Sequence, residues 1–435
     1  MIADVAVIGA GPAGIAATSI LAEAGRRVIL LDESPETGGQ IWRHRRGHAP
    51  SRAARPWLSR LHRSGAILQT GCSVLDVRDD AESAHFDILA ERDSAPLVVR
   101  AGTLLIATGA RERFLPFPGW TLPGVVGVGG AQALLKGGLD VAGKRVVIAG
   151  SGPLLLPVAA SLAAAGARLA LVAEQAPRTN VMRFALGLWR TPSSLLQAAR
   201  YRAAFRRTPY VMGTWVISAR GNGRVQEVGV TDGRTERTIP CDLLCAAYGL
   251  VPDRRLAALV GCESSSVGVR VDDGQRTSRP RVFAAGETTG VGGVAKALVE
   301  ARIAAATILG QAPSRALLRR RAALRALAAH LDEAFTLRTE LRHLAAPDTI
   351  VCRCEDVTLG ALRGEWTTRQ AKLYTRVGMG SCQGRVCGGA LEFLHGWCED
   401  AVRSPIAPAL VSTLIDHSSG HSAEGENSDA TEGTD

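Results

Sequence analysis

The chain has 435 residues, a formal net charge of +10 and nine cysteines, with 46% hydrophobic and 4% aromatic residues. This length is enough for two or three domains, each with its own hydrophobic core. The longest apolar run, residues 154–173, is broken by a proline, a glycine and an arginine, so no stretch qualifies as a membrane span.

The basic residues gather at 43–63 and 315–325. Neither cluster has the interleaved aromatic residues of a recognisable nucleic-acid-binding fold, so we expect no nucleic-acid partner. The clusters are either a solvated arginine-rich surface or a contact surface for an acidic partner protein or an anionic cofactor.

The N-terminus, MIADVAVIGAGPAG, lacks a charged leader and a cleavage site, which predicts no secretory signal. We therefore expect a cytoplasmic location, with or without peripheral contact with the inner membrane through an electron acceptor. In a reducing compartment, clustered thiols are available to bind metal and are not consumed by disulfides.

Two stretches share the strand–turn–helix–strand pattern of a dinucleotide-binding unit. In the first, we expect strands at 4–9 and 27–32 and a helix at 11–25 that ends at Gly25. In the second, strands at 144–150 and 168–174 flank a helix. The units begin about 140 residues apart, so the chain contains an internal repeat at the scale of a domain.

The rest of the chain connects and extends these units. Strands that run into glycine turns are expected at 104–110, 243–253 and 281–290, with a helix at 294–310 after the last. Residues 315–344 then read as a long amphipathic helix whose apolar stripe is Leu317, Leu324 and Leu331.

A phosphate-binding fingerprint opens the first unit: Gly9-x-Gly11-x-x-Gly14 follows a strand and starts a helix, and Asp32 ends the next strand. The glycines allow a tight turn and let a pyrophosphate approach backbone amides at the helix N-terminus. Asp32 is placed to accept hydrogen bonds from a ribose. The strand–helix–strand context makes this a strong nucleotide-binding signal.

Three later motifs favour FAD over NAD: Gly38-Gly39-Gln40, Ala107-Thr108-Gly109 and Ala285-Gly286-Glu287. Their spread resembles that of the glutathione/thioredoxin reductase superfamily, in which the late Gly-acid pair contacts the flavin's ribityl–phosphate chain. The acid here is Glu287, where Asp is more usual. Together the motifs predict an FAD site formed by Gly9, Gly11, Pro12, Ala13, Gly14, Asp32, Glu33, Gly39, Gln40, Thr108, Gly109, Gly286 and Glu287.

The catalytic cysteine pair of a disulfide reductase is missing, because no C-x4-C follows Gly39 and the second unit has no C-x-x-C. Cys241 and Cys245 lie in a strand pattern and read as ordinary buried cysteines. No catalytic residue is assigned; His44 and His48 are candidates by position only.

The second unit carries a degenerate fingerprint. Gly150-x-Gly152 begins it, and Glu174 could serve as its ribose acid. The third position is Leu155, where a small residue normally allows close helix–strand packing, and Pro157 follows in the first turn. Four roles of this unit therefore stay open: an NAD(P) site, a scaffold, a subunit interface or a site for another nucleotide.

Four cysteines form two tight pairs near the C-terminus, Cys352-x-Cys354 and Cys382-x4-Cys387. Four thiolates can hold tetrahedral zinc or a [2Fe–2S] cluster, or they can be unliganded core cysteines. The C-x-C opening is uncommon for zinc ribbons. Cys398 is the nearest alternative ligand in the sequence.

The segments CRCEDV and TRVGMGSCQGRVC resemble the bacterioferritin-associated-ferredoxin-like (BFD-like) [2Fe–2S] domain, with C-x4-C where its smallest members have C-x2-C. The whole order of parts resembles the larger flavin/iron–sulfur (alpha) subunit of bacterial multi-subunit amino-acid and opine dehydrogenases. That family includes octopine and nopaline oxidase A subunits, proline and hydroxyproline dehydrogenase alpha subunits and a hydrogen cyanide synthase subunit. GSGPLLLPVA and GMGSCQGRVC are the most specific pieces.

The resemblance implies an α/β fold with two Rossmann-like dinucleotide-binding domains of the glutathione/thioredoxin reductase type and a small BFD-like [2Fe–2S] domain. The expected parts are a discontinuous FAD domain (1–115 and 246–312), a degenerate second domain (116–245), a helical arm (313–347), the cysteine domain (348–404) and a disordered tail (417–435).

The resemblance also implies a function. In that family, an amine substrate is oxidised on a partner beta subunit, a flavoprotein of the D-amino-acid-oxidase type. The resemblance therefore implies that electrons reach the FAD and the cluster of this chain from that partner, often in a complex with a small ferredoxin-like subunit. Two alternatives remain: an NAD(P)H-dependent flavin reductase, and a non-enzymatic redox or assembly subunit with structural zinc.

Overall fold

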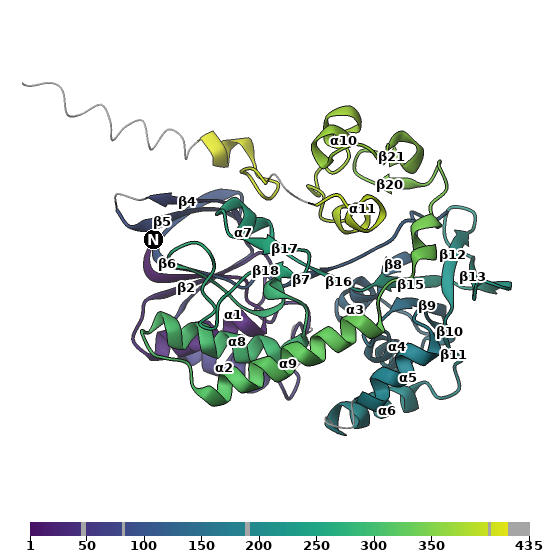
Figure 1. Cartoon of the computed structure of the whole chain (residues 1–435), viewed down its shortest axis with the longest axis horizontal. Coiled ribbons are helices and arrows are strands. Elements are labelled where there is room, and N and C mark those ends of the chain that lie inside the picture. Colours follow the sequence, from purple (N-terminus) through teal and green to yellow (C-terminus); the bar gives the residue numbers. More distant parts are fainter. Residues whose placement is uncertain (45–48, 81–82, 188–191, 399–401, 416–435) are drawn as a thin grey trace, which may run out of the picture.

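The computed structural model of the chain describes residues 1–44, 49–80, 83–187, 192–398 and 402–415. His48 and the tail expected to be disordered, 417–435, lie outside these residues. Figure 1 shows two lobes side by side, with the cysteine segment above them and a long helix crossing beneath.

The first lobe is built on a seven-stranded sheet of order β3-β2-β1-β6-β5-β4, with β19 paired to β6. The strands β1, β2, β3, β6 and β19 are parallel, whereas β4 and β5 form an antiparallel extension. Their bounds are β1 (Ile2–Ile8), β2 (Val28–Asp32), β3 (Ile67–Thr70), β4 (Cys72–Asp80), β5 (His85–Arg92), β6 (Ala95–Ile106) and β19 (Val282–Ala284).

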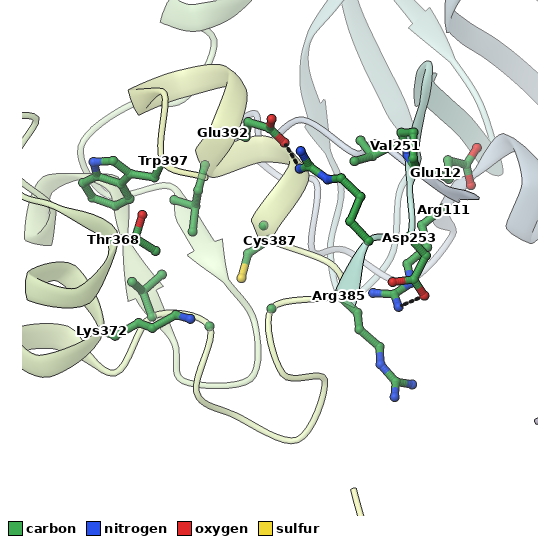
Figure 2. Close-up of a pocket in the computed structure, with 18 residues that line it drawn as sticks. Arg111, Glu112, Val251, Asp253, Thr368, Lys372, Arg385, Cys387, Glu392 and Trp397 are labelled. Atoms are coloured by element: carbon green, nitrogen blue, oxygen red, sulfur yellow. Dashed lines mark hydrogen bonds and ion pairs between the residues drawn. The ribbon is translucent and has the colours of Figure 1, made fainter. Parts of the chain in front are cut away.

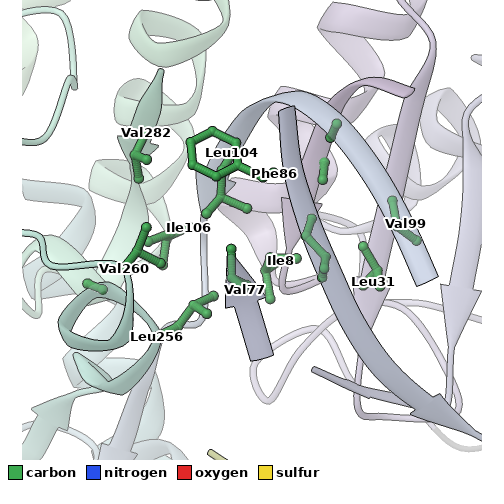
Figure 3. Packing of buried hydrophobic residues seen from close by; sticks show 14 of the residues in the cluster. Ile8, Leu31, Val77, Phe86, Val99, Leu104, Ile106, Leu256, Val260 and Val282 are labelled. Atoms are coloured by element: carbon green, nitrogen blue, oxygen red, sulfur yellow. The ribbon is translucent and has the colours of Figure 1, made fainter. Parts of the chain in front are cut away.

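Apolar layers cover both faces of this sheet, which explains the nearly continuous apolar sequences of β1 and β2. One layer, drawn in Figure 3, packs Phe86, Leu104 and Ile106 against Leu256 and Val260. The other holds the helices α1 (Pro12–Glu23), α2 (Arg55–Arg63) and α8 (Gly293–Ile308). The helix predicted at 11–25 is thus present, and Gly25 beyond its end adopts φ +83°.

The second lobe repeats the pattern with a parallel sheet of order β11-β10-β9-β15-β8. Its strands are β8 (Val125–Gly127), β9 (Arg145–Ser151), β10 (Arg168–Glu174), β11 (Tyr210–Met212) and β15 (Leu243–Tyr248). Its helices are α3 (Val128–Lys136), α4 (Leu155–Ala164), α5 (Arg178–Gly187) and α6 (Pro192–Ala204). An antiparallel sheet adds β12 (Trp215–Arg220), β13 (Glu227–Thr231) and β14 (Glu236–Pro240).

Two short strands, β7 (Ala110–Glu112) and β16 (Leu250–Pro252), pair where the chain passes between the lobes. The strand expected at 243–253 is therefore two strands, β15 and β16, separated at Gly249 with φ +91°. Because β15 continues to Tyr248, the second sheet includes residues on both sides of the expected boundary at 245/246. The remaining elements of the first lobe are α7 (Arg255–Leu259), β17 (Ser264–Ser265), β18 (Gly268–Val269) and the 3₁₀ turn η2 (Gly286–Thr289).

The long helix α9 (Arg315–Ala334) packs against α8 of the first lobe and α5 of the second. Leu317, Leu324 and Leu331 are half-buried, as the predicted stripe requires. The helix was expected to continue to residue 344 and does not. The chain leaves it at Phe335 and forms a separate 3₁₀ turn, η3 (Thr339–His343), because residues 335–338 bind to the second lobe.

The cysteine segment folds into a small unit of short elements with its own apolar cluster. These elements are β20 (Ile350–Cys352), β21 (Val357–Thr358), η4 (Leu359–Ala361), α10 (Thr368–Thr375) and α11 (Gly388–His395). After it, residues 402–415 return to the first lobe, where the Ile406 N–H donates to the carbonyl of Leu75. Among the helices of the described ranges, none has the length and apolar character needed to cross a membrane.

Candidate functional site

A cavity of about 520 Å³ opens at the carboxyl edge of the first sheet. This volume is in the usual range for a site that buries a small molecule or cofactor. Ile8, Leu31 and Ala107, at or next to the ends of β1, β2 and β6, line it. Ligands of open α/β sheets bind at this edge, so the fold places a nucleotide-sized cavity where the fingerprint predicts one.

The fingerprint glycines are needed because the backbone is crowded around them. A Cβ on Gly14 would lie 1.8 Å from the carbonyl oxygen of Gly9, and one on Gly39 would lie 2.9 Å from Cα of Gly11. Gly9 itself has φ +108° and would clash with the carbonyl of Ala107 at 2.3 Å. Gly11 instead faces open space, with nothing within 4 Å of a Cβ. The N-terminus of α1 is therefore left bare toward the cavity, as phosphate binding requires.

Asp32 lies at the cavity wall, where a ribose acid is expected. Its carboxylate accepts hydrogen bonds from the N–H of Ala10 at 2.5 Å and of Ser34 at 2.8 Å. Burial raises the pKa of Asp32, and these two backbone donors oppose that rise. The carboxylate is thus held by the turn that surrounds it, with Glu33 beside it at the cavity.

The turn at Gly286 and Glu287 is held from behind by a buried ion pair. Lys296 and Glu300, one turn apart on α8, are 3% and 0% exposed and lie 2.9 Å apart. The Glu300 carboxylate also accepts from the N–H of Gly286 at 3.0 Å and the hydroxyl of Thr289 at 2.8 Å. The Lys296 ammonium donates to the carbonyl of Gly286 at 3.0 Å. The pair therefore fixes both polar backbone groups of Gly286.

Twelve of the thirteen residues predicted for the FAD site line this one cavity. Gly14 lies behind it, against Gly9. His44, a candidate by position, is absent from the cavity wall and lies 3.3 Å from the carbonyl of Trp42 through its Nδ1. The structure thus brings the predicted residues together and gives His44 no place among them.

Charged side chains that the sequence did not point out also line the cavity. Asp253, just after β16, forms ion pairs with Arg111 and Arg255. These two guanidinium groups lower the pKa of Asp253 against the opposing effect of its burial, which would raise it. Arg385, from the loop between Cys382 and Cys387, lines the same cavity. Within this group Arg111, Arg255 and Arg385 outnumber Asp253, so the group suits an anionic ligand. Asp32, Glu33, Glu112 and Glu287 also line the cavity.

The corresponding position in the second lobe is covered by the chain itself. The Ser151 hydroxyl donates to the carbonyl of Phe335 at 3.0 Å, and the Gln175 amide donates to the carbonyl of Thr336 at 3.2 Å. The backbone N–H of Arg338 donates to Gln175 at 3.2 Å. The segment 335–338, which follows α9, therefore lies on the turn where a dinucleotide pyrophosphate would bind.

Glu174 does not fit its expected role as a ribose acid. It is fully buried, and its carboxylate accepts from the N–H groups of Gly152 and Ala176, each at 2.8 Å. Burial raises its pKa to about 7. Leu155 is also fully buried in the apolar cluster under α4. Glu174 and Leu155 thus both serve the interior of the second lobe.

The four predicted cysteines meet in two pairs. The hydrogen bond with Cys387 lowers the pKa of Cys352 to about 5, and the same contact raises the pKa of Cys387. Burial raises the pKa of Cys382, and contact with Cys354 adds to that rise. Cys352 and Cys387 are buried, Cys382 is half-buried and Cys354 is exposed.

Backbone amides point at these sulfur atoms. The amides of Gly378, Glu355 and Cys354 favour the thiolate of Cys352, and those of Val386 and Gly384 favour the thiolate of Cys382. Such donors are typical of sulfur ligands to a metal or cluster. A Cβ on Gly380 would lie 2.3 Å from Cβ of Cys354, which explains a glycine there.

The cysteine unit has the ligand chemistry but not a closed ligand shell. Within the residues that the structure describes, no three or more His, Cys, Asp or Glu side chains are close enough together to hold a metal ion. The two thiol pairs would have to approach each other to bind one. Cys398, the alternative ligand, is exposed, and its sulfur lies 3.8 Å from the carbonyl of Gly396.

The unit is docked on both lobes. Glu392 on α11 forms a half-buried ion pair with Arg254 at 3.1 Å, shown as a dashed line in Figure 2. The indole N–H of Trp120 donates to the carbonyl of Ile350 at 2.6 Å. A small cavity of about 70 Å³ between α11 and β16 is lined by Cys387 and Asp253. Four residues, Arg111, Glu112, Asp253 and Arg385, line both this cavity and the larger one.

A family model described as pyridine nucleotide-disulphide oxidoreductase matches residues 3–306. The chain belongs to the pyridine nucleotide-disulphide oxidoreductase family. Members of this family bind FAD. The close-packed glycines of the fingerprint, the open N-terminus of α1 and the volume of the cavity fit that cofactor.

Two relatives match this chain over almost its whole length. The A subunit of opine oxidase from Agrobacterium tumefaciens is 33% identical, covering 94% of this chain and 91% of the relative. The hydrogen cyanide synthase subunit HcnB of Pseudomonas aeruginosa is also 33% identical, covering 91% and 92%. The chain is thus homologous to these subunits of multi-subunit oxidoreductases, as the sequence resemblance predicted.

Solved structures agree on the fold. L-proline dehydrogenase from P. horikoshii matches with a TM-score of 0.67 at 22% identity, covering 95% of this chain and 79% of that one. Thioredoxin reductase from T. acidophilum matches with a TM-score of 0.56 at 24% identity, covering 71% and 98%. The predicted thioredoxin-reductase type of the two nucleotide-binding lobes is therefore confirmed.

Sequence reasoning missed several residues of the site. Lys296 and Glu300 were detectable as two charges four residues apart in an apolar helix, since charges in such a position need each other. Asp253 is the last residue of the strand predicted at 243–253, and site residues of α/β folds are found at strand ends. Arg385 lies within CQGRVC, but that motif does not predict that its side chain lines the flavin cavity.

Proposed function

We propose that this chain is the FAD- and [2Fe–2S]-containing subunit of a hetero-oligomeric dehydrogenase that oxidises an amino acid, an opine or a related amine. FAD would be held by the first lobe through the thirteen predicted residues, and the cluster by Cys352, Cys354, Cys382 and Cys387. When bound, FAD supplies two-electron chemistry and the cluster one-electron transfer.

The observation that carries this proposal is that the two sites are neighbours. Cys387 and Asp253 line one small cavity, and Asp253 also lines the flavin cavity. The residues of the chain position the two redox groups next to each other, because the half-buried ion pair of Glu392 with Arg254 docks the cysteine unit beside β16.

The source of electrons is a partner and not NAD(P)H. In favour of this, residues 335–338 cover the turn of the second nucleotide fold, and Glu174 has no exposed oxygen for a ribose. Both relatives, from opine oxidase and from hydrogen cyanide synthase, are named as subunits. We propose a D-amino-acid-oxidase-like flavoprotein as the partner that binds the amine, with a small ferredoxin-like subunit as a further member and a cytoplasmic location.

The proposal is tested by co-expressing the chain with such a partner flavoprotein and following amine-dependent reduction of an artificial electron acceptor. The complex should reduce the acceptor, whereas the chain alone should not. A Cys382→Ser complex should keep its FAD and lose most of the activity. Acceptor reduction by the chain alone with NADH would contradict the proposal and support a flavin reductase.

A further inference from the structure

Arg385 belongs to the cysteine unit by sequence and to the flavin cavity by position. It lies between Cys382 and Cys387, yet its side chain lines the large cavity of the first lobe. Figure 2 shows it extending away from the Cys387 sulfur. Its Nη1 lies 3.7 Å from the carboxylate of Glu33, which follows the expected ribose acid.

The loop that carries Arg385 is a tight turn. The N–H of Arg385 donates to the carbonyl of Cys382 at 3.0 Å, and the N–H of Gly388 donates to that of Gly384 at 2.7 Å. Gln383 and Gly384 have positive φ values of +54° and +76°. Whatever fixes the two cysteines of this turn therefore also fixes the direction of the arginine between them.

The guanidinium of Arg385 is short of negative partners. Its side chain is 26% exposed, and its Nε is buried with no hydrogen-bond partner in the described parts of the chain. Arg255 and Arg111 line the same cavity as Arg385. Asp253 already pairs with those two arginines, and Glu33 is 67% exposed. An additional anion at this point would compensate three guanidinium groups.

The position of Arg385 along the cavity indicates which anion. The sequence predicts the ribose at Asp32 and the ribityl–phosphate chain at Gly286 and Glu287. Arg385 lines the same cavity, with its Nη1 3.7 Å from the carboxylate of Glu33. In FAD, a pyrophosphate joins the adenosine ribose to the ribityl chain. We propose that Arg385 binds the pyrophosphate of the dinucleotide, so that the cluster loop forms one wall of the flavin site.

This inference rests on the proposed function and goes beyond it, because it couples the two cofactors. If cluster assembly fixes Cys382 and Cys387, it also presents Arg385 to the pyrophosphate. By thermodynamic linkage, FAD in turn stabilises the loop in its cluster-binding form. Loss of the cluster then weakens FAD binding, and loss of FAD weakens retention of the cluster.

The test is an FAD titration of the full-length chain, prepared with and without its iron–sulfur cluster, in the wild type and in an Arg385→Gln variant. A charge-assisted contact of this kind changes affinity by about 10- to 100-fold. We expect that loss in Arg385→Gln with the cluster present, and a comparable loss in the cluster-free wild type. Removing the cluster from Arg385→Gln should add little further loss, and Arg385→Lys should fall between the two.

Arg376→Gln is the matched control. It removes the same charge from the same unit, but Arg376 is 66% exposed and pairs with Glu355 at 2.7 Å on the outer face. Its FAD affinity should stay within about twofold of the wild type. Circular dichroism of each variant checks that the chain is folded.

Equal FAD affinity in Arg385→Gln and the wild type would overturn the inference, as would an equal loss in Arg376→Gln. These outcomes are distinct from failure of the proposed function. A wild-type chain that binds no FAD refutes both. A chain that binds FAD but assembles no cluster refutes the proposed function and the coupling, while Arg385→Gln still tests the pyrophosphate contact.

Discussion

Replacing Glu300 with Gln should destabilise the first lobe and weaken its hold on FAD. The substitution keeps the shape of the side chain but removes the charge that faces Lys296, which is only 3% exposed. Removing one partner of a buried ion pair costs about 3–5 kcal/mol, because the other charge stays buried without compensation. One carboxylate oxygen of Glu300 accepts from Gly286 and Lys296, and the other accepts from Arg325. Gln has a single acceptor oxygen, so its NH2 group must face one set of these donors, and the support of the turn at the flavin cavity weakens.

The assay is the free energy of unfolding of the flavin lobe, followed by release of flavin fluorescence in urea, together with the FAD dissociation constant. We expect a loss of about 3–5 kcal/mol and at least about tenfold weaker FAD binding, since tenfold corresponds to about 1.4 kcal/mol. Burial lowers the pKa of Lys296, so the cost should shrink at high pH, where the unpaired ammonium can lose its proton.

Glu23→Gln is the control for this prediction. Glu23 pairs with Arg60 at 2.6 Å, but the two side chains are 41% and 36% exposed. An exposed pair contributes about 0–1 kcal/mol. A double variant, Lys296→Met with Glu300→Leu, should recover much of the stability but not the FAD affinity. The reasoning is refuted if Glu300→Gln unfolds within about 1 kcal/mol of the wild type and binds FAD normally.

Four further predictions follow from the geometry. Gly14→Ala should destabilise the first lobe, because its Cβ would lie 1.8 Å from a backbone oxygen. Gly11→Ala should leave the melting temperature unchanged and weaken only FAD binding, because nothing lies within 4 Å of its Cβ. Thermal melts and FAD titrations separate the two effects. Burial raises the folded-state pKa of Glu174 to about 7 from 4.5, so the folded state binds a proton that the unfolded state has lost, and the free energy of unfolding should fall as pH rises from 4.5 to 7. This slope should vanish in Glu174→Gln, as measured by urea denaturation at several pH values. Cys398→Ser should retain the metal content of the wild type while Cys382→Ser loses it, measured by elemental analysis, and equal losses would reassign the ligands. NADH should neither bleach the flavin nor quench protein fluorescence, since residues 335–338 occupy the second fold; rapid bleaching would contradict that geometry.

The nucleotide-binding lobes could be predicted because their signals are local. A buried strand, a glycine turn and an acid at the next strand end lie within about 30 residues, and sterics alone explain Gly9 and Gly14. The family resemblance was also predicted from continuous motifs and is confirmed over more than nine-tenths of the chain. For the same reason the ligand set of four cysteines was a natural prediction, and it stays a prediction.

Long-range packing was not predictable in the same way. The amphipathic stripe of α9 continues in the sequence beyond Ala334, so periodicity predicted a longer helix; hydrogen bonds from Ser151 and Gln175, more than 150 residues away, end it. Glu174 matched the pattern of a ribose acid, but it is fully buried and accepts hydrogen bonds from two backbone amides. The outward direction of Arg385 depends on how the cysteine unit docks, which a motif does not encode.

The most direct test of the account is the ultraviolet–visible spectrum of the anaerobically purified chain, with FAD, iron, acid-labile sulfide and zinc measured on the same sample. We expect flavin bands, a broad iron–sulfur shoulder that disappears in Cys382→Ser, and about two iron ions and two sulfides per chain. Flavin bands with stoichiometric zinc and no iron would contradict it, because the chain would then hold a flavin without an electron relay.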